Sequence, residues 1–232
     1  MENPLNLTPV FHVGPVPLTQ PVLLTWAIMA ALALGCHLAT RRMTLRPGRV
    51  QTVLEMAVTT VDDLIRETMR RDPAPFRALI GSLLIFVLIA NWSGLLPGLE
   101  APTAHVETDA ALALVVFAAT IGAGLRLRGL AGYLKTFAEP SWIMIPLNLV
   151  EEITRTFSLF VRLFGNVMSG VFISGIILSL AGLLVPIPFM ALDLLTGAIQ
   201  AYIFAVLATV FIGAAAGEEP GPHPLPDTKD TP

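Results

Sequence analysis

Long uncharged stretches alternate with shorter charged connectors along this chain. A helix needs about 20 predominantly apolar residues to cross a membrane, and the uncharged stretches reach or approach that length. Two prolines, Pro186 and Pro188, interrupt the last long stretch, so we expect a hairpin there. The pattern therefore predicts membrane helices near residues 20–40, 76–97, 109–126, 142–184 and 187–216.

The connector after the first span has a different pattern. Apolar residues recur at helical spacing from Val50 to Met69, with acidic and basic residues between them. This spacing predicts an amphipathic helix near 50–71. The helix would lie on the cytoplasmic membrane surface or pack on the other helices as a short connector, and both arrangements give the same topology.

Composition agrees with a membrane protein. Hydrophobic residues make up 54% of the chain and charged residues only 13%, against roughly 25% charged residues in a soluble domain. These figures exclude a disordered chain, a basic nucleic-acid-binding protein and most soluble enzymes. We expect an all-α integral membrane protein, with a single membrane domain over 1–217 and a disordered cytoplasmic tail over 218–232. The only cysteine, Cys36, excludes an internal disulfide.

Basic residues are distributed unevenly among the connectors. Residues 41–77 contain eight Lys or Arg and residues 126–141 contain three, whereas residues 98–109 and the segment before Pro21 contain none. Because basic connectors stay in the cytoplasm, we expect the N-terminus outside and the C-terminus inside. The chain begins with neither a basic signal-peptide leader nor an Arg- and Ser-rich import leader, so we expect a bacterial inner-membrane protein.

Arg162 is the most informative residue because it lies inside an apolar stretch. Placing an Arg at the centre of a membrane helix costs about 2.5–3.5 kcal/mol on insertion scales, and Arg cannot lose its proton to avoid that cost. Such a residue faces protein or a water-filled cavity; structural pairing with a carboxylate and snorkelling to the interface are the alternatives. Asn166 and Ser169 follow it by four and seven residues, so they share its helix face.

Arg155 lies two turns before Arg162 on the same side of the predicted helix. Glu151 and Glu152 precede it by four and three residues. Side chains at these separations meet on a helix surface, so a local ion pair is the expected arrangement for Arg155.

The last span carries polar residues on one face as well. Asp193 and Gln200 are seven residues apart, with Thr196 between them. Asp193 fits equally well as an interfacial carboxylate at a helix start, favoured by the helix dipole, or as part of an ion path. Gln200 lies deeper, where a buried amide needs a hydrogen-bond partner; this partner is a neighbouring helix or Arg162.

Catalytic motifs are absent from the sequence. There is no HExxH, GxSxG, Walker A or GxGxxG motif, and the four histidines are scattered. We therefore expect no catalytic residue, no metal site and no cofactor. The functional groups that remain are charged side chains inside the predicted membrane spans, chiefly Arg162 and Asp193.

Three separate segments resemble subunit a of the F-type rotary ATP synthases. The most specific is RLFGN at 162–166, which follows the run PLNLVEE at 146–152 inside one long predicted helix. Residues 91–98 are similar to the family pattern NxxGLxPG, and residues 200–207 are similar to QAxIFxxL. The resemblance extends over roughly 20–217.

The resemblance implies a stator that lies beside a ring of c subunits and provides two offset ion half-channels. It implies that Arg162 is the essential arginine, that Gln200 faces it from the last helix, that Asn166 lines a half-channel and that Asp193 belongs to the outer half-channel. The last two helices would form a hairpin against the ring. The implied partners are the c ring, b-type stator subunits, the F1 ATPase head and membrane lipid, without nucleic acid. Possible supporting polar residues are Asn91, Asn148, Glu151, Glu152, Arg155, Ser169 and Thr196.

Two positions differ from some relatives. Val171 stands where many carry an ionisable residue, and Gly94 stands where some carry an acid. The family role implies a subunit that is not an enzyme by itself and that couples H⁺ flow to ATP synthesis, with Na⁺ as the alternative ion. A self-contained small ion transporter, and a scaffold in which Arg162 pairs with Asp193, remain alternative hypotheses.

Overall fold

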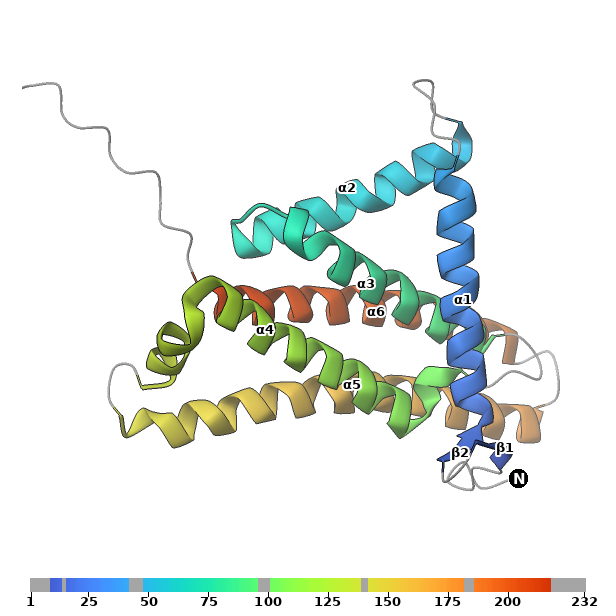
Figure 1. The fold of residues 1–232 in the computed structure, drawn as a ribbon. Helices are drawn as coiled ribbons and strands as arrows, with labels where there is room; N and C mark the ends of the chain where they lie inside the picture. Colours follow the sequence, from blue (N-terminus) through green and yellow to red (C-terminus); the bar gives the residue numbers. More distant parts are fainter. Residues whose placement is uncertain are drawn as a thin grey trace, which may run out of the picture.

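The computed structural model describes residues 9–13, 16–41, 48–95, 101–138, 142–181 and 186–217. Helices dominate these residues (Figure 1). A short 3-10 turn, η1 (Pro102–Ala104), and two short strands, β1 (Pro9–Val13) and β2 (Val16–Thr19), complete the fold. The α-helices are α1 (Gln20–Thr40), α2 (Arg49–Met69), α3 (Ala74–Ser93), α4 (Val106–Ala138), α5 (Met144–Ala181) and α6 (Pro186–Ala216).

Five helices are long and apolar enough to cross a membrane: α1, α3, α4, α5 and α6. This confirms the predicted all-α membrane architecture and its number of candidate spans. The bounds differ most at α3, which ends at Ser93 rather than near 97, and at α4, which continues to Ala138 rather than ending near 126. The predicted tail at 218–232 lies outside the described residues.

The extra length of α4 contains a sharp change of direction at Gly129. Its φ of 71° is readily adopted only by glycine. Beyond this point the chain folds back, since Arg128 Nη1 donates a hydrogen bond to Thr136 Oγ1 at 2.5 Å and the ring of Tyr133 lies against Gly124. The predicted connector at 126–141 is therefore largely helical.

The sequence pattern did not predict the two strands. They pair antiparallel, with Pro9 opposite Thr19 and Val13 opposite Val16. Strands of four and five residues are too short to show a clear period of two, and several prolines lie within and between them. The pairing places the N-terminal segment beside the start of α1 (Figure 1).

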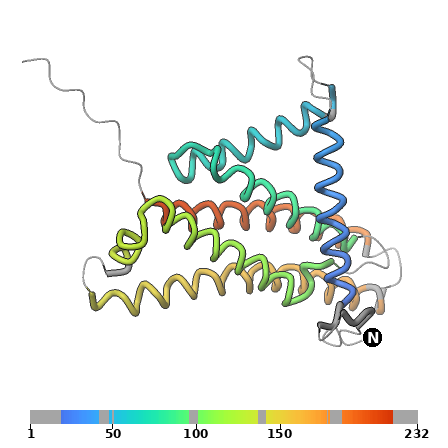
Figure 2. Tube along the Cα trace, in the orientation of Figure 1, coloured from blue at the N-terminus to red at the C-terminus, as the bar shows by residue number. Residues whose placement is uncertain are grey.

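Helix α6 is the centre of the bundle. It contacts α2, α3, α4 and α5. Helices α3, α4, α5 and α6 run side by side, across the direction of α1 (Figures 1 and 2). The buried face of α6 consists mainly of small residues around Phe204, including Ala201, Ala205 and Ala208. Small residues let helix backbones approach closely within a membrane, which is why one helix can contact four others.

The amphipathic helix predicted near 50–71 is α2, and its two halves differ. In the second half, Val61, Leu64 and Ile65 are buried against Ile80 of α3 and Ala205 of α6. In the first half, apolar side chains such as those of Val53, Met56 and Val58 are exposed. The second half therefore packs on the other helices as a connector would, while the first half keeps an uncovered apolar face.

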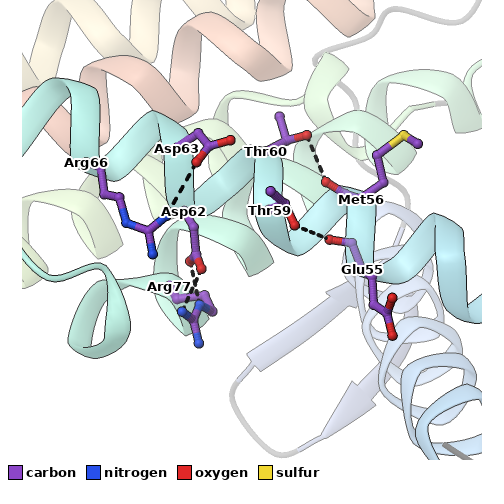
Figure 3. A network of polar contacts seen from close by, with 8 residues as sticks. All are labelled: Glu55, Met56, Thr59, Thr60, Asp62, Asp63, Arg66 and Arg77. Atoms are coloured by element: carbon purple, nitrogen blue, oxygen red, sulfur yellow. Dashed lines mark hydrogen bonds and ion pairs between the residues drawn. The ribbon is translucent and has the colours of Figure 1, made fainter. Parts of the chain in front are cut away.

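A bidentate ion pair fixes the packed half of α2 to α3. Arg77 donates from Nε to Asp62 Oδ1 at 2.5 Å and from Nη2 to Oδ2 at 2.6 Å (Figure 3). The Arg77 guanidinium lowers the pKa of the Asp62 carboxyl below its ordinary value. Beside it, the exposed pair Arg66–Asp63, at 3.5 Å, lies within α2 itself and does not join two helices.

Candidate functional site

Helices α5 and α6 present their polar side chains around a shared apolar core. Leu159 and Leu163 of α5 are buried in one cluster with Ala201 and Phe204 of α6. Arg162 lies between these buried positions in sequence but is exposed on the α5 surface. The hairpin contact thus buries the leucines and leaves the arginine at the edge.

Arg162 lines a groove of about 540 Å³ between α5 and α6. The groove also includes Glu151, Arg155 and Ser158 from α5 and Phe211 from α6. Among the described residues, none forms a hydrogen bond or an ion pair with the Arg162 side chain. Its charge is therefore available to a group outside this part of the chain.

Arg155 has the local partners that its spacing predicted. Its guanidinium forms an ion pair with Glu151, lies 4.0 Å from Glu152, and stands 5.8 Å from the centroid of the Phe211 ring on α6. The local ion pair is confirmed. The ring contact is a cation–π interaction that also connects the two helices.

Asp193 lies against α5 at the other end of the hairpin. Its Oδ2 accepts a hydrogen bond from Ser174 Oγ at 3.2 Å. A Cβ added to Gly170 would stand 2.9 Å from Asp193 Oδ1, so the absence of a side chain at this position makes room for the carboxylate. In this structure Asp193 pairs with Ser174 rather than with Arg162, which disfavours the scaffold hypothesis.

Gln200 and Asn166 lie between these two ends. Gln200 is buried and Asn166 is half-buried. Within the described ranges, neither side chain forms a hydrogen bond, and none joins either one to Arg162. The facing of Gln200 and Arg162 that the resemblance implies stays a prediction.

Asn91 fastens the end of α3 to α6. Its Nδ2 donates to the carbonyl oxygen of Gly197 at 3.0 Å, and Trp92 Nε1 donates to the carbonyl oxygen of Leu194, also at 3.0 Å. The Asn91 Oδ1 atom is buried without a hydrogen-bond partner among the described residues. The NxxGL segment therefore acts here as a helix-to-helix attachment.

The other polar positions expected in a supporting role contact their own helix or stay outside the groove. Thr196 donates to the carbonyl oxygens of Leu192 and Asp193, and Ser169 donates to that of Asn166. Asn148 is half-buried near the start of α5. Val171 is exposed on α5.

A polar group that sequence reasoning missed surrounds η1 and the start of α4. Thr103 and Asp109 are fully buried, and His105 is nearly so. A signal was present: Asp109 precedes Leu112 and Ala113 by three and four residues, which places it on their helix face. Because Asp109 is charged, the sequence pattern places it in the connector at 98–109.

These features define a multi-pass α-helical membrane protein whose last two helices hold unpaired polar groups at their edge. The model of the ATP synthase A chain family matches residues 22–213, so the chain belongs to this family. Subunit a is a non-catalytic membrane subunit of ATP synthase, as the resemblance implied.

The chain aligns with individual relatives over nearly their whole length. The chain is 59% identical over 216 residues to "ATP synthase subunit a 2" of Bradyrhizobium sp. strain BTAi1, covering 93% of this chain and 97% of the relative. It is 44% identical to "ATP synthase subunit a" of Albidiferax ferrireducens, covering 91% and 93%. It is 45% identical to "ATP synthase subunit a 1" of Prosthecochloris aestuarii, covering 89% and 93%.

Proposed function

We propose that this chain is the stator of the membrane sector of a bacterial ATP synthase and that Arg162 couples H⁺ flow to rotation of a c-subunit ring. The observation that carries the proposal is the unpaired, exposed guanidinium of Arg162 at the edge of the α5–α6 contact. A permanent charge within a membrane-spanning helix needs a partner or water. A carboxylate of the neighbouring ring supplies that partner.

The fixed positive charge explains the coupling. A nearby cation favours the ionised form of a carboxylate and lowers its pKa, so a ring carboxylate releases its proton as it approaches Arg162. After it passes Arg162, the carboxylate is protonated again from the other side. The same cation repels protons that would otherwise cross directly between the two paths.

Two polar regions supply the paths on either side of Arg162. The groove with Glu151, Arg155 and Ser158 leads from the start of α5 and serves as the inner half-channel. The region of Asp193 and Ser174 lies at the far end of the hairpin and serves as the outer half-channel. Asn166 lies between Arg162 and Ser174 on α5, and Gln200 follows Asp193 by seven residues on α6; both contribute polar groups between the outer region and the arginine.

The orientation follows from charge and from the position of α2. The connector at 41–77 contains eight basic residues, and α2 lies at the end of α1 opposite to the β1–β2 hairpin (Figure 1). Basic connectors remain in the cytoplasm, so α2 lies on that side and its exposed apolar residues Val53, Met56 and Val58 contact the membrane surface. The N-terminus is outside and the C-terminus is inside.

Disulfide cross-linking in the assembled complex tests whether the Arg162 face of α5 contacts the ring. The variants Ser158→Cys and Ser169→Cys, in a Cys36→Ser background, place single cysteines on exposed positions of that face. Each should form a disulfide with a cysteine placed beside the ring carboxylate, whereas Leu163→Cys, at a fully buried position, should not. The proposal is wrong if neither exposed position forms a cross-link in active complexes.

The coupling ion is tested separately. ATP synthesis by membranes that contain the complex should continue in sodium-free buffer and should stop when a protonophore is added. A strict requirement for Na⁺ would instead establish the alternative ion while leaving the role of Arg162 intact.

A further inference from the structure

Asp109 is a buried acidic residue that takes no part in the mechanism proposed above. Its side chain is fully buried in the first turn of α4. Neither of its carboxylate oxygens has a hydrogen-bond partner in the described part of the chain. An Asp in a first helical turn can accept hydrogen bonds from backbone N–H groups, but Asp109 accepts none there, so capping does not account for its burial.

The helix face that Asp109 occupies leads into the functional hairpin. Residues Leu112, Ala113 and Val116 continue the same face and are buried in one cluster with Leu163 of α5 and Phe204 of α6. Asp109 thus lies one turn outward from the apolar core that supports Arg162. The end of α3, the start of α4, the end of α5 and the start of α6 gather at this end of the bundle (Figures 1 and 2).

Other buried oxygen atoms at this end of the bundle also lack partners. Thr103 Oγ1 in η1 and Asn91 Oδ1 at the end of α3 are buried without hydrogen bonds among the residues that the structure describes. The turn η1 contacts α1, α3, α4 and α5. Asn91 is bonded to Gly197, one turn from Asp193 on α6, so these oxygens lie at the level of the outer half-channel.

Unpaired buried oxygens of this kind require a partner from outside the chain. A buried polar atom without a hydrogen bond is costly, and an unpaired buried carboxylate is more so. Carboxylate, hydroxyl and amide oxygens accept hydrogen bonds from water and bind hard cations. Water or a cation that reaches these oxygens from the outer end of the bundle would supply the missing partners.

We propose that Asp109 is an ion-accepting carboxylate of the outer half-channel, in a hydrated pocket that Asn91 and Thr103 help to line and that leads to Asp193. This inference rests on the proposed function and extends its outer path to α4. The ligand class is the coupling cation, carried as a proton on the carboxylate or as a hydrated metal ion.

Charge removal at Asp109 is the first test, performed in the complete ATP synthase. The variant Asp109→Asn keeps the shape of the side chain. It should assemble normally, yet lower passive ion flux through the membrane sector by about tenfold or more, as loss of a proton-transfer group does. The matched control is Glu107→Gln, in the same turn of α4 at an exposed position, which should leave flux unchanged. Wild-type flux in Asp109→Asn overturns the inference.

Water access is the second test, and it remains decisive if Asp109→Asn assembles poorly. In a Cys36→Ser background, Asp109→Cys should react with silver ions added from the outer side. Ala113→Cys, one turn deeper in the dry core, should not react. Equal lack of reaction at both positions overturns the inference. Failure here is distinguishable from failure of the proposed function, because Arg162→Ala would still abolish coupling.

Discussion

The Asp193 carboxylate of α6 accepts a hydrogen bond from the Ser174 hydroxyl of α5 at 3.2 Å. The two helices approach closely enough for this contact because Gly170, one turn before Ser174, has no side chain. This end of the hairpin therefore holds its acidic residue between two helices. Asp193 can occupy this position only when residue 170 has no side chain.

Gly170→Ala should displace Asp193 and lower ion flux several-fold. The added Cβ would stand 2.9 Å from Asp193 Oδ1, closer than a carbon and an oxygen can approach without movement. Passive flux through the membrane sector is the measurement. Gly175→Ala is the matched control on the same helix, because a Cβ there meets no atom within 4 Å and position 175 lies away from the Arg162 face. Equal flux in the two variants would contradict this placement of Asp193.

Asn91→Ala should loosen the attachment of α3 to α6. It removes the 3.0 Å hydrogen bond to the Gly197 carbonyl oxygen, and such bonds between membrane helices contribute about 0.6 kcal/mol on average. We expect a small decrease in the thermal stability of the detergent-solubilised complex. Ser82→Ala is a suitable control, since Ser82 is exposed on α3 and bonds only to its own helix, at Leu79.

The Asp62–Arg77 pair should make the attachment of α2 depend on pH. Arg77 lowers the pKa of Asp62 in the folded protein, so the pair stabilises the fold above the ordinary Asp pKa of about 3.9. That contribution is lost as the pH falls through the lowered folded-state pKa. Asp62→Asn should therefore lower the melting temperature at neutral pH, and the difference from wild type should shrink in strong acid.

The control for this prediction lies next to the pair. Asp63 forms an exposed ion pair with Arg66 within α2, and exposed pairs contribute little to stability. Asp63→Asn should change the melting temperature much less than Asp62→Asn at neutral pH. Similar effects from both substitutions would contradict the role given to the Asp62–Arg77 pair.

Hydrophobic patterning was sufficient to predict the membrane architecture, because a membrane span is a local property of about 20 consecutive residues. The ion pair of Arg155 was also predictable, since its partners lie within one helical turn on its own helix. Both features depend on residues that are close together in the chain. Spacing alone is enough to identify them.

Contacts between distant helices were less accessible from the sequence. The burial of Asp109 depends on how η1 packs on four helices, and spacing along one helix does not reveal that packing. Likewise, the apolar spacing of α2 is regular along the whole helix, yet among the described residues only its second half packs against α3 and α6. The partner expected for Arg162 belongs to another chain, so neither this sequence nor its fold contains it.

ATP synthesis by membranes containing Arg162→Ala complexes is the most direct test of the central claim. The control is Arg126→Ala, because Arg126 is an exposed arginine of α4 that does not line the groove. The account predicts that Arg162→Ala complexes assemble but do not synthesise ATP from an ion gradient, while Arg126→Ala complexes synthesise it normally. Normal ion-driven synthesis by assembled Arg162→Ala complexes would contradict the claim that this charge couples ion flow to rotation.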